Sequence, residues 1–80
     1  MTKQEFRQTE EYKKAVEKVK GYNKGFEFTI PLYKMTEGQR NAMFIIMQDC
    51  QKEGLIESIS IGYGFTDSGI DMTEETYKRL

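Results

Sequence analysis

Two segments of the chain alternate between apolar and polar side chains, the first of them strictly, and this alternation limits the possible folds more than any other feature. The segments span residues 26–33 and 56–65. Because successive side chains of a strand point to opposite faces, the pattern predicts two strands, each with one buried face and one solvent face. The predicted buried side chains are Phe26, Phe28, Ile30 and Leu32 in the first segment, and Ile59, Ile61, Tyr63 and Phe65 in the second.

The first of these strands contains Pro31. Proline donates no backbone hydrogen bond, so we expect this strand to lie at the edge of a sheet. The sequence leaves the direction of strand pairing open. Two strands alone are marginally stable in water, and a third strand or a covering helix is needed to complete the layer.

The central helix is predicted from its two ends. Thr36 and Gln39 have the spacing of a capping box, and Gly54 follows the last apolar position. We therefore predict a helix over residues 36–53. Its apolar side chains are spaced at helical intervals, as expected for a helix that packs against a sheet.

An earlier helix is predicted over about residues 9–20, with Thr9 as its cap. A start at residue 3 is the alternative, because Thr2 and Glu5 also have capping-box spacing. Phe6 lies off the apolar stripe of this helix. Residues 1–8 are therefore expected to be a separate or frayed segment.

The C-terminal part begins with a turn. Asp67, Ser68 and Gly69 are typical turn residues, so Ile70 is expected to return as a short third strand. The spacing of acidic and hydroxyl residues from position 71 onward then predicts a brief final helix that ends at Leu80. The chain is thus expected to be a single α+β domain over residues 1–80, a small two-layer sandwich in the order α-β-α-β-(β)-α, with its helices on one face of a two- or three-stranded sheet.

The composition argues against catalysis. The chain has 80 residues, one cysteine and no histidine. Without histidine the usual general base at neutral pH is missing, and a structural zinc site needs several Cys or His ligands. We expect a protein that is not an enzyme and has no catalytic residue, cofactor or metal. No apolar run is long enough to span a membrane, so a cytoplasmic location and no membrane contact are expected.

The central helix has more apolar side chains than one buried face can use. Phe44 lies at the margin of its apolar stripe and Ile45 lies outside the stripe. Either a second layer of the protein covers them, or another protein does. In the second case they are anchors of a protein-binding surface, whose polar rim would be Asn41, Gln48, Asp49 and Lys52.

These features favour a small non-enzymatic protein-binding module. Its partner would be a larger protein, or a second copy in a homodimer. From size and composition we expect steric occlusion, as by an inhibitor of host defence of the anti-CRISPR kind made by a bacterium, a phage or another mobile element.

A small nucleic-acid-binding regulator is the alternative function. Residues 1–25 contain seven Lys or Arg against four Glu, whereas residues 55–80 have two against five acidic residues. Basic residues near aromatic ones can contact phosphates and stacked bases. The formal net charge of −1 makes this partner the less favoured one. The residues concerned are Lys13, Lys14, Lys18, Lys20 and Lys24.

Two further motifs have simpler explanations. Residues 62–65, Gly-Tyr-Gly-Phe, resemble the aromatic RNP1 strand of RNA-recognition motifs, whose rings stack on bases. The flanking positions depart from that pattern, and the alternation assigns Tyr63 and Phe65 to the core. Residues 67–75 are rich in oxygen ligands but lack the spacing of a calcium-binding loop, so turn and cap roles explain their acidic residues.

Overall fold

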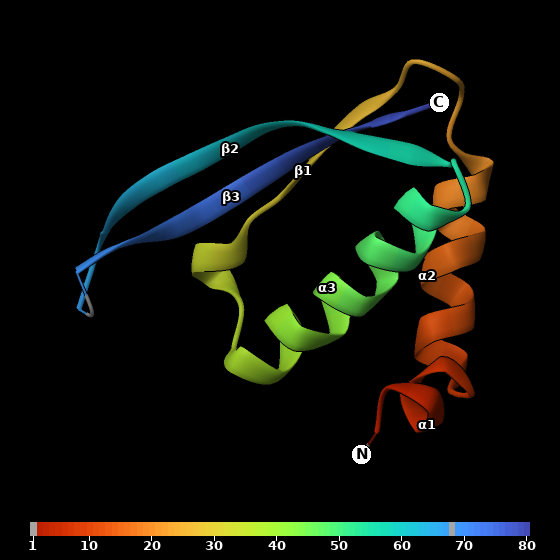
Figure 1. Ribbon diagram of the computed structural model, residues 1–80, viewed down its shortest axis with the longest axis horizontal. Coiled ribbons are helices and arrows are strands. Elements are labelled where there is room, and N and C mark those ends of the chain that lie inside the picture. Colours follow the sequence, from red (N-terminus) through yellow and green to blue (C-terminus); the bar gives the residue numbers. More distant parts are fainter. Residues whose placement is uncertain (1, 68) are drawn as a thin grey trace.

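The computed structural model describes residues 2–67 and 69–80 of the chain. Helices and strands form two layers, with a twisted antiparallel sheet above and the helices below it in Figure 1. The α+β fold class predicted from the sequence is confirmed. The elements are α1 (Lys3–Arg7), α2 (Glu10–Gly21), β1 (Glu27–Ile30), the 3-10 turn η1 (Leu32–Lys34), α3 (Glu37–Lys52), β2 (Ile56–Thr66) and β3 (Gly69–Arg79).

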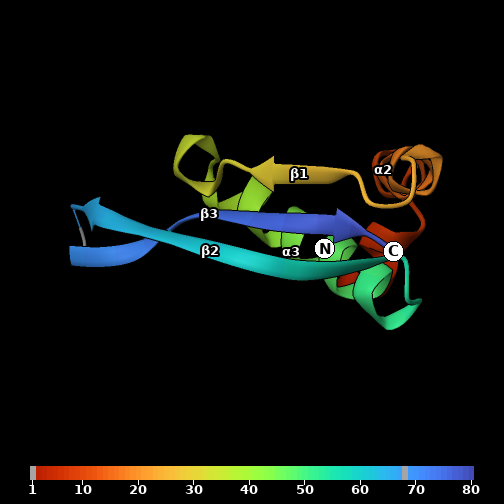
Figure 2. The same cartoon turned by 90° about the horizontal axis from the view of Figure 1, so that it is seen from above.

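The strands are ordered β1-β3-β2, and both neighbouring pairs are antiparallel. Figure 2 shows β3 between the other two strands. β1 is an edge strand, as Pro31 indicated, and it ends one residue before that proline. The helices lie on one face of the sheet, with α3 running diagonally beneath it (Figure 1).

The predicted helix caps are present. Thr36 accepts a hydrogen bond from the backbone nitrogen of Gln39 at 3.2 Å, and the Gln39 side chain accepts one from the Thr36 nitrogen at 2.9 Å. Thr2 and Glu5 form the same reciprocal arrangement at the start of α1. α1 is a separate short helix, and its Phe6 is buried in the core beside Tyr12 of α2.

The prediction of a final helix is wrong, because residues 69–79 form the long strand β3. The acidic residues that resembled a helix cap belong to this strand instead. β3 pairs with strands on both of its sides, and these ladders satisfy its backbone groups more completely than a short terminal helix would. A local capping signal does not reveal pairing with residues far away in the chain, so tertiary context overrides it.

The core lies between α3 and the inner half of the sheet. Tyr77 of β3 is 2% exposed, and its ring stacks on Phe28 of β1 with the ring centroids 5.8 Å apart. Partly buried side chains from α2, α3 and β1 surround this centre. The buried apolar side chains are Phe6, Val19, Leu32, Ile46, Met47, Cys50, Ile56 and Tyr77.

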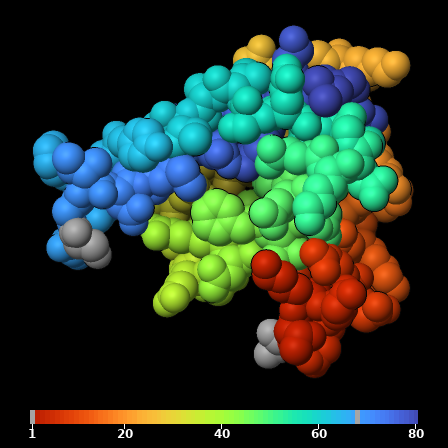
Figure 3. All heavy atoms as spheres, viewed as in Figure 1, coloured from red at the N-terminus to blue at the C-terminus, as the bar shows by residue number. Residues whose placement is uncertain are grey.

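The outer half of the β2–β3 hairpin extends past the helices. Figures 1 and 3 show the hairpin projecting to the left beyond the helical layer. β2 has 11 residues and α3 has 16, which correspond to lengths of about 36 Å and about 24 Å. The helix is therefore too short to cover the whole hairpin. The expectation that the apolar face of residues 59–65 is core is wrong, because Ile59, Ile61, Tyr63 and Phe65 are all exposed.

Two isoleucines of the same hairpin provide a matched test of the difference between its covered inner half and its uncovered outer half. Ile56 is 2% exposed and Ile70 is 71% exposed. We expect Ile56→Ala to lower the free energy of unfolding by about 2–4 kcal/mol, because it leaves a cavity in the core. Ile70→Ala should cost less than about 1 kcal/mol, the range of strand propensity. Urea unfolding followed by circular dichroism measures both, and equal losses would contradict the described packing.

Candidate protein-docking surface

The exposed apolar side chains of the hairpin share one face. Directly opposed residues of an antiparallel pair point to the same side of the sheet. Ser58 opposes the buried Tyr77, and Ile61 opposes Glu75, which accepts a hydrogen bond from the Tyr77 hydroxyl. The row of β2 side chains that includes Ile61 therefore lies on the same face of the sheet as Tyr77, which is the face that the helices cover. We call its uncovered part the hairpin face, formed by Ile61, Tyr63, Phe65, Ile70 and Met72.

The most exposed side chains of this face lie near the hairpin tip. Phe65 is 88% exposed, and Tyr63 is 66% exposed. Phe65 opposes Ile70, and Tyr63 opposes Met72. Cross-strand aromatic and aliphatic pairs of this kind stabilise a hairpin and also form a continuous apolar surface.

The two glycines of β2, Gly62 and Gly64, keep large side chains off the opposite face of this strand. A Cβ atom on Gly62 would lie 2.7 Å from Cγ of Glu74, and one on Gly64 would lie 2.9 Å from Cγ2 of Thr73. The side chains of Glu74 and Thr73 therefore lie across β2 in space that a larger residue would fill. The Gly-Tyr-Gly-Phe pattern thus separates an aromatic face from a polar face.

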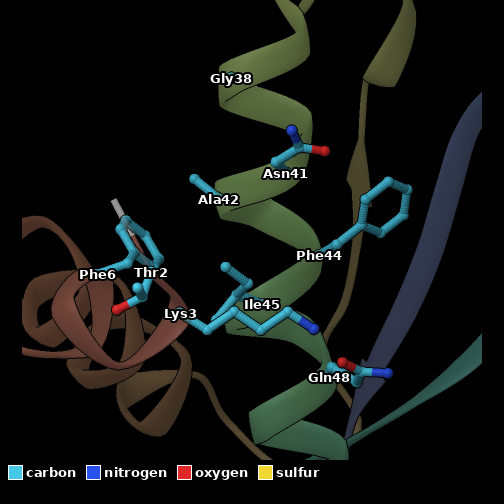
Figure 4. A pocket seen from close by; sticks show the side chains of 9 residues that line it. All are labelled: Thr2, Lys3, Phe6, Gly38, Asn41, Ala42, Phe44, Ile45 and Gln48. Carbon is cyan, nitrogen blue, oxygen red and sulfur yellow. The ribbon is translucent and has the colours of Figure 1, made fainter.

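Phe44 and Ile45, the predicted anchors, have different environments. Figure 4 shows Ile45 pointing toward α1 and Phe44 pointing away from α1, toward the sheet. Ile45 is half-buried and packs against the core, whereas Phe44 is 43% exposed. They border an open groove of about 560 Å³ between α1 and α3, together with Phe6 and Ala42. α1 is the second layer that partly covers Ile45, whereas Phe44 remains partly exposed to solvent.

The residues of the predicted polar rim also have different environments. Asn41, Gln48 and Lys52 are exposed on α3. Asp49 instead joins the three helices: Arg7 of α1 donates to its two carboxylate oxygens at 2.8 and 3.0 Å, and the hydroxyl of Tyr12 in α2 donates at 2.7 Å. Hydrogen bonds from Arg7 and Tyr12 hold the pKa of Asp49 below its ordinary value. No sequence motif predicts this cluster, because its members are far apart in the chain.

Tyr12 offers a direct test of the cluster. Its hydrogen bond to the Asp49 carboxylate raises the pKa of Tyr12 to about 12. We expect Tyr12→Phe to lower the free energy of unfolding by about 1 kcal/mol at neutral pH. Because the folded-state pKa is raised, this contribution is complete below the ordinary value of 10.0 and is lost as pH rises toward 12.

The measurement is urea unfolding of wild type and Tyr12→Phe at several pH values. An absorbance titration of the folded proteins provides the control, since the variant should lack the phenol ionisation near pH 12. If the two proteins differ equally at neutral pH and at pH 12, the hydroxyl does not act through its bond to Asp49.

The other sequence candidates for chemistry are dispersed or enclosed. Cys50 is buried in the core, and this burial raises the pKa of its thiol. Among the described residues, no three of His, Cys, Asp and Glu are grouped as metal ligands. Asp67 and Asp71 are exposed, and Ser68 of that turn lies outside the described residues. None of the described helices combines the length and the hydropathy required to cross a membrane.

The lysines of the alternative nucleic-acid surface lie on α2 and just after it, on the opposite side of the molecule from the hairpin tip (Figure 1). All five are exposed. Glutamates are interleaved with them, and Lys20 forms an ion pair with Glu17 at 3.8 Å. Nucleic-acid binding stays a prediction, with Lys13, Lys14, Lys18, Lys20 and Lys24 as its residues.

The chain matched no family model, no curated protein and no solved structure in comparisons with known proteins.

Proposed function

We propose that this protein is a non-enzymatic binding module that docks on a larger protein through the hairpin face. The observation that supports this most strongly is the exposure of Tyr63, Phe65 and Ile70 on a hairpin that projects beyond its own helices. Large apolar groups gathered on one projecting surface are typical of protein interaction sites.

The expected gain in free energy is large enough for this surface to anchor a complex. Burying one such side chain contributes about 1.5–3 kcal/mol. The aromatic rings of Tyr63 and Phe65 are also among the side chains that most often dominate binding energy. The antiparallel ladder holds them in place before binding, which lowers the entropic cost of association.

Phe44 extends the proposed surface onto α3. It points toward the sheet from the helix beneath it (Figure 4), and it is the one predicted anchor that the described chain leaves about half exposed. Asn41 and Gln48 are exposed on the same helix and supply a polar rim. In the proposed complex, Ile45 and Asp49 support the surface from inside rather than contacting the partner.

The proposed mode of action is steric occlusion. A narrow hairpin that extends past a small domain can enter a groove of a larger protein, while the helical layer blocks the surroundings. We include in this proposal the class of anti-defence inhibitors, of the anti-CRISPR kind, that phages and mobile elements produce and that act in the cytoplasm. Small size and an apolar surface without an enclosed reaction centre among the described residues support this class.

A double substitution tests the docking surface. Tyr63→Ser with Phe65→Ser removes both rings at exposed positions, so we expect the fold to persist, with an unfolding free energy within about 1 kcal/mol of wild type. Chemical cross-linking in cells that express the protein should yield a complex with wild type and none with the double variant. Tyr33→Ser is the control, because Tyr33 is exposed but lies in η1, outside the hairpin face.

Equal cross-linking of wild type and the folded double variant would contradict the docking surface. The inhibitor class has its own test, which is the plating of a targeted phage on bacteria with active CRISPR immunity. We expect wild type to restore plaque formation and the double variant to fail.

A further inference from the structure

Over residues 56–65, the outer edge of β2 pairs with no other strand of the described chain. β2 pairs with β3 on one side, and within the described residues no strand pairs with its other side. Figure 2 shows no element lying alongside the outer half of this edge. An unpaired strand edge presents backbone donors and acceptors that can pair with another extended chain.

The backbone pattern identifies which residues face outward. The Arg79 nitrogen donates to the Phe26 carbonyl at 2.8 Å, so the backbone groups of Arg79 point toward the β1 side of the sheet. Because the backbone groups of alternate residues point to the same side of a strand, those of Tyr77 and Glu75 also point toward β1. The backbone groups of the β2 residues opposite them, Ser58 and Ile61, therefore point away from β3. Following this alternation along β2, the outward-facing residues are Ser58, Ile61, Tyr63 and Phe65.

This edge lacks most of the features that normally prevent strand pairing. β2 contains no proline and no lysine, and its only charged residue is Glu57 near one end. The β2–β3 ladder has two register shifts, one at Ile59 and one between Gly62 and Tyr63. The extra residue of the second shift is Thr73 of β3, so β2 itself alternates regularly from Ser60 to Phe65. β1, the other edge strand, is by contrast only four residues long and is followed by Pro31.

The charge of the hairpin argues against a second copy as the occupant. Residues 56–77 contain no Lys or Arg, so two hairpins paired at their β2 edges would bring like charges together. The acidic side chains are Glu57, Asp67, Asp71, Glu74 and Glu75.

The acidic groups also lie on a defined side of the strand. Gly62 opposes Glu74 and Gly64 opposes Asp71, so these acidic residues belong to the face opposite the aromatic rings. A Cβ atom on Gly62 would lie 3.1 Å from Oε1 of Glu74, which places this carboxylate over the edge strand itself. A strand added at the edge would meet apolar rings on one face and carboxylates on the other.

We infer that the partner contributes an extended segment in which apolar residues alternate with Lys or Arg, and that this segment adds to the sheet along the outer edge of β2. The inference rests on the proposed docking function and names the partner element. Main-chain hydrogen bonds provide affinity, and the alternating side chains provide specificity. The apolar residues of the segment continue the hairpin face, and its cations lie beside Glu74 and Asp71.

Synthetic peptides of defined sequence test this inference directly. The probes are a fluorescent peptide that alternates Lys and Val, and the same peptide with Glu in place of Lys. We expect the Lys peptide to bind at least about tenfold more tightly at low salt, with the difference decreasing as salt rises. Amide NMR signals of Ser58, Ile61, Tyr63 and Phe65 should shift on binding.

Two matched variants separate edge pairing from general attraction. Ser58→Pro removes an outward-facing N–H, whereas Ser58→Ala loses the same exposed hydroxyl but keeps that donor. One lost hydrogen bond should weaken binding of the Lys peptide about fivefold in Ser58→Pro, with no change in Ser58→Ala. Glu74→Gln should weaken binding of the Lys peptide and leave binding of the Glu peptide unchanged or slightly stronger.

Three results would overturn the inference: equal binding of both peptides, no shift at the outward-facing amides, or a dimer in light scattering whose β2 amides are protected from exchange. One result would contradict the inference but support the proposed docking function. In that case the cross-linked complex is lost in the Tyr63 and Phe65 double variant but retained in Ser58→Pro.

Discussion

The β2–β3 hairpin is about half as long again as the helix that supports it, and the other features of the molecule follow from this mismatch. Where α3 lies beneath the sheet, residues such as Ile56 and Tyr77 are enclosed. Beyond α3 the same face of the sheet continues without cover, and its apolar residues become a surface. The same sheet face is thus core at one end of the hairpin and an exposed apolar surface, the proposed docking surface, at the other.

The helices are held beneath the inner half by a polar cluster as well as by apolar packing. Asp49 of α3 binds Arg7 and Tyr12, so one carboxylate fixes α1 and α2 against the central helix. This arrangement positions Phe6 over the flank of α3 that includes Ile45. Because α1 lies on that flank, Phe44 on the other flank is left beside the sheet and in partial contact with solvent.

Local patterns predicted the helices and two of the strands because caps, glycines and alternation act over a few residues. For the segment that forms β3, a short strand at Ile70 followed by a helix was expected, because the cap-like spacing after residue 71 is a local signal, whereas the pairing of β3 with β1 joins residues far apart in the chain. Alternation also showed that Ile61, Tyr63 and Phe65 share a face, but it could not show that no helix covers that face. Burial depends on the relative lengths of packed elements, which become apparent only in three dimensions. For the same reason the sequence did not distinguish Phe44 from Ile45, or an exposed rim residue from the enclosed Asp49.

The central claim is that the outer hairpin face is open to solvent in the isolated monomer. Solvent paramagnetic relaxation of isoleucine methyl signals measures this directly, with a soluble gadolinium chelate as the probe. We expect strong relaxation of the Ile61 and Ile70 methyls and little relaxation of those of Ile46 and Ile56. Protection of Ile61 and Ile70 to the level of Ile46 in a verified monomer would contradict the account.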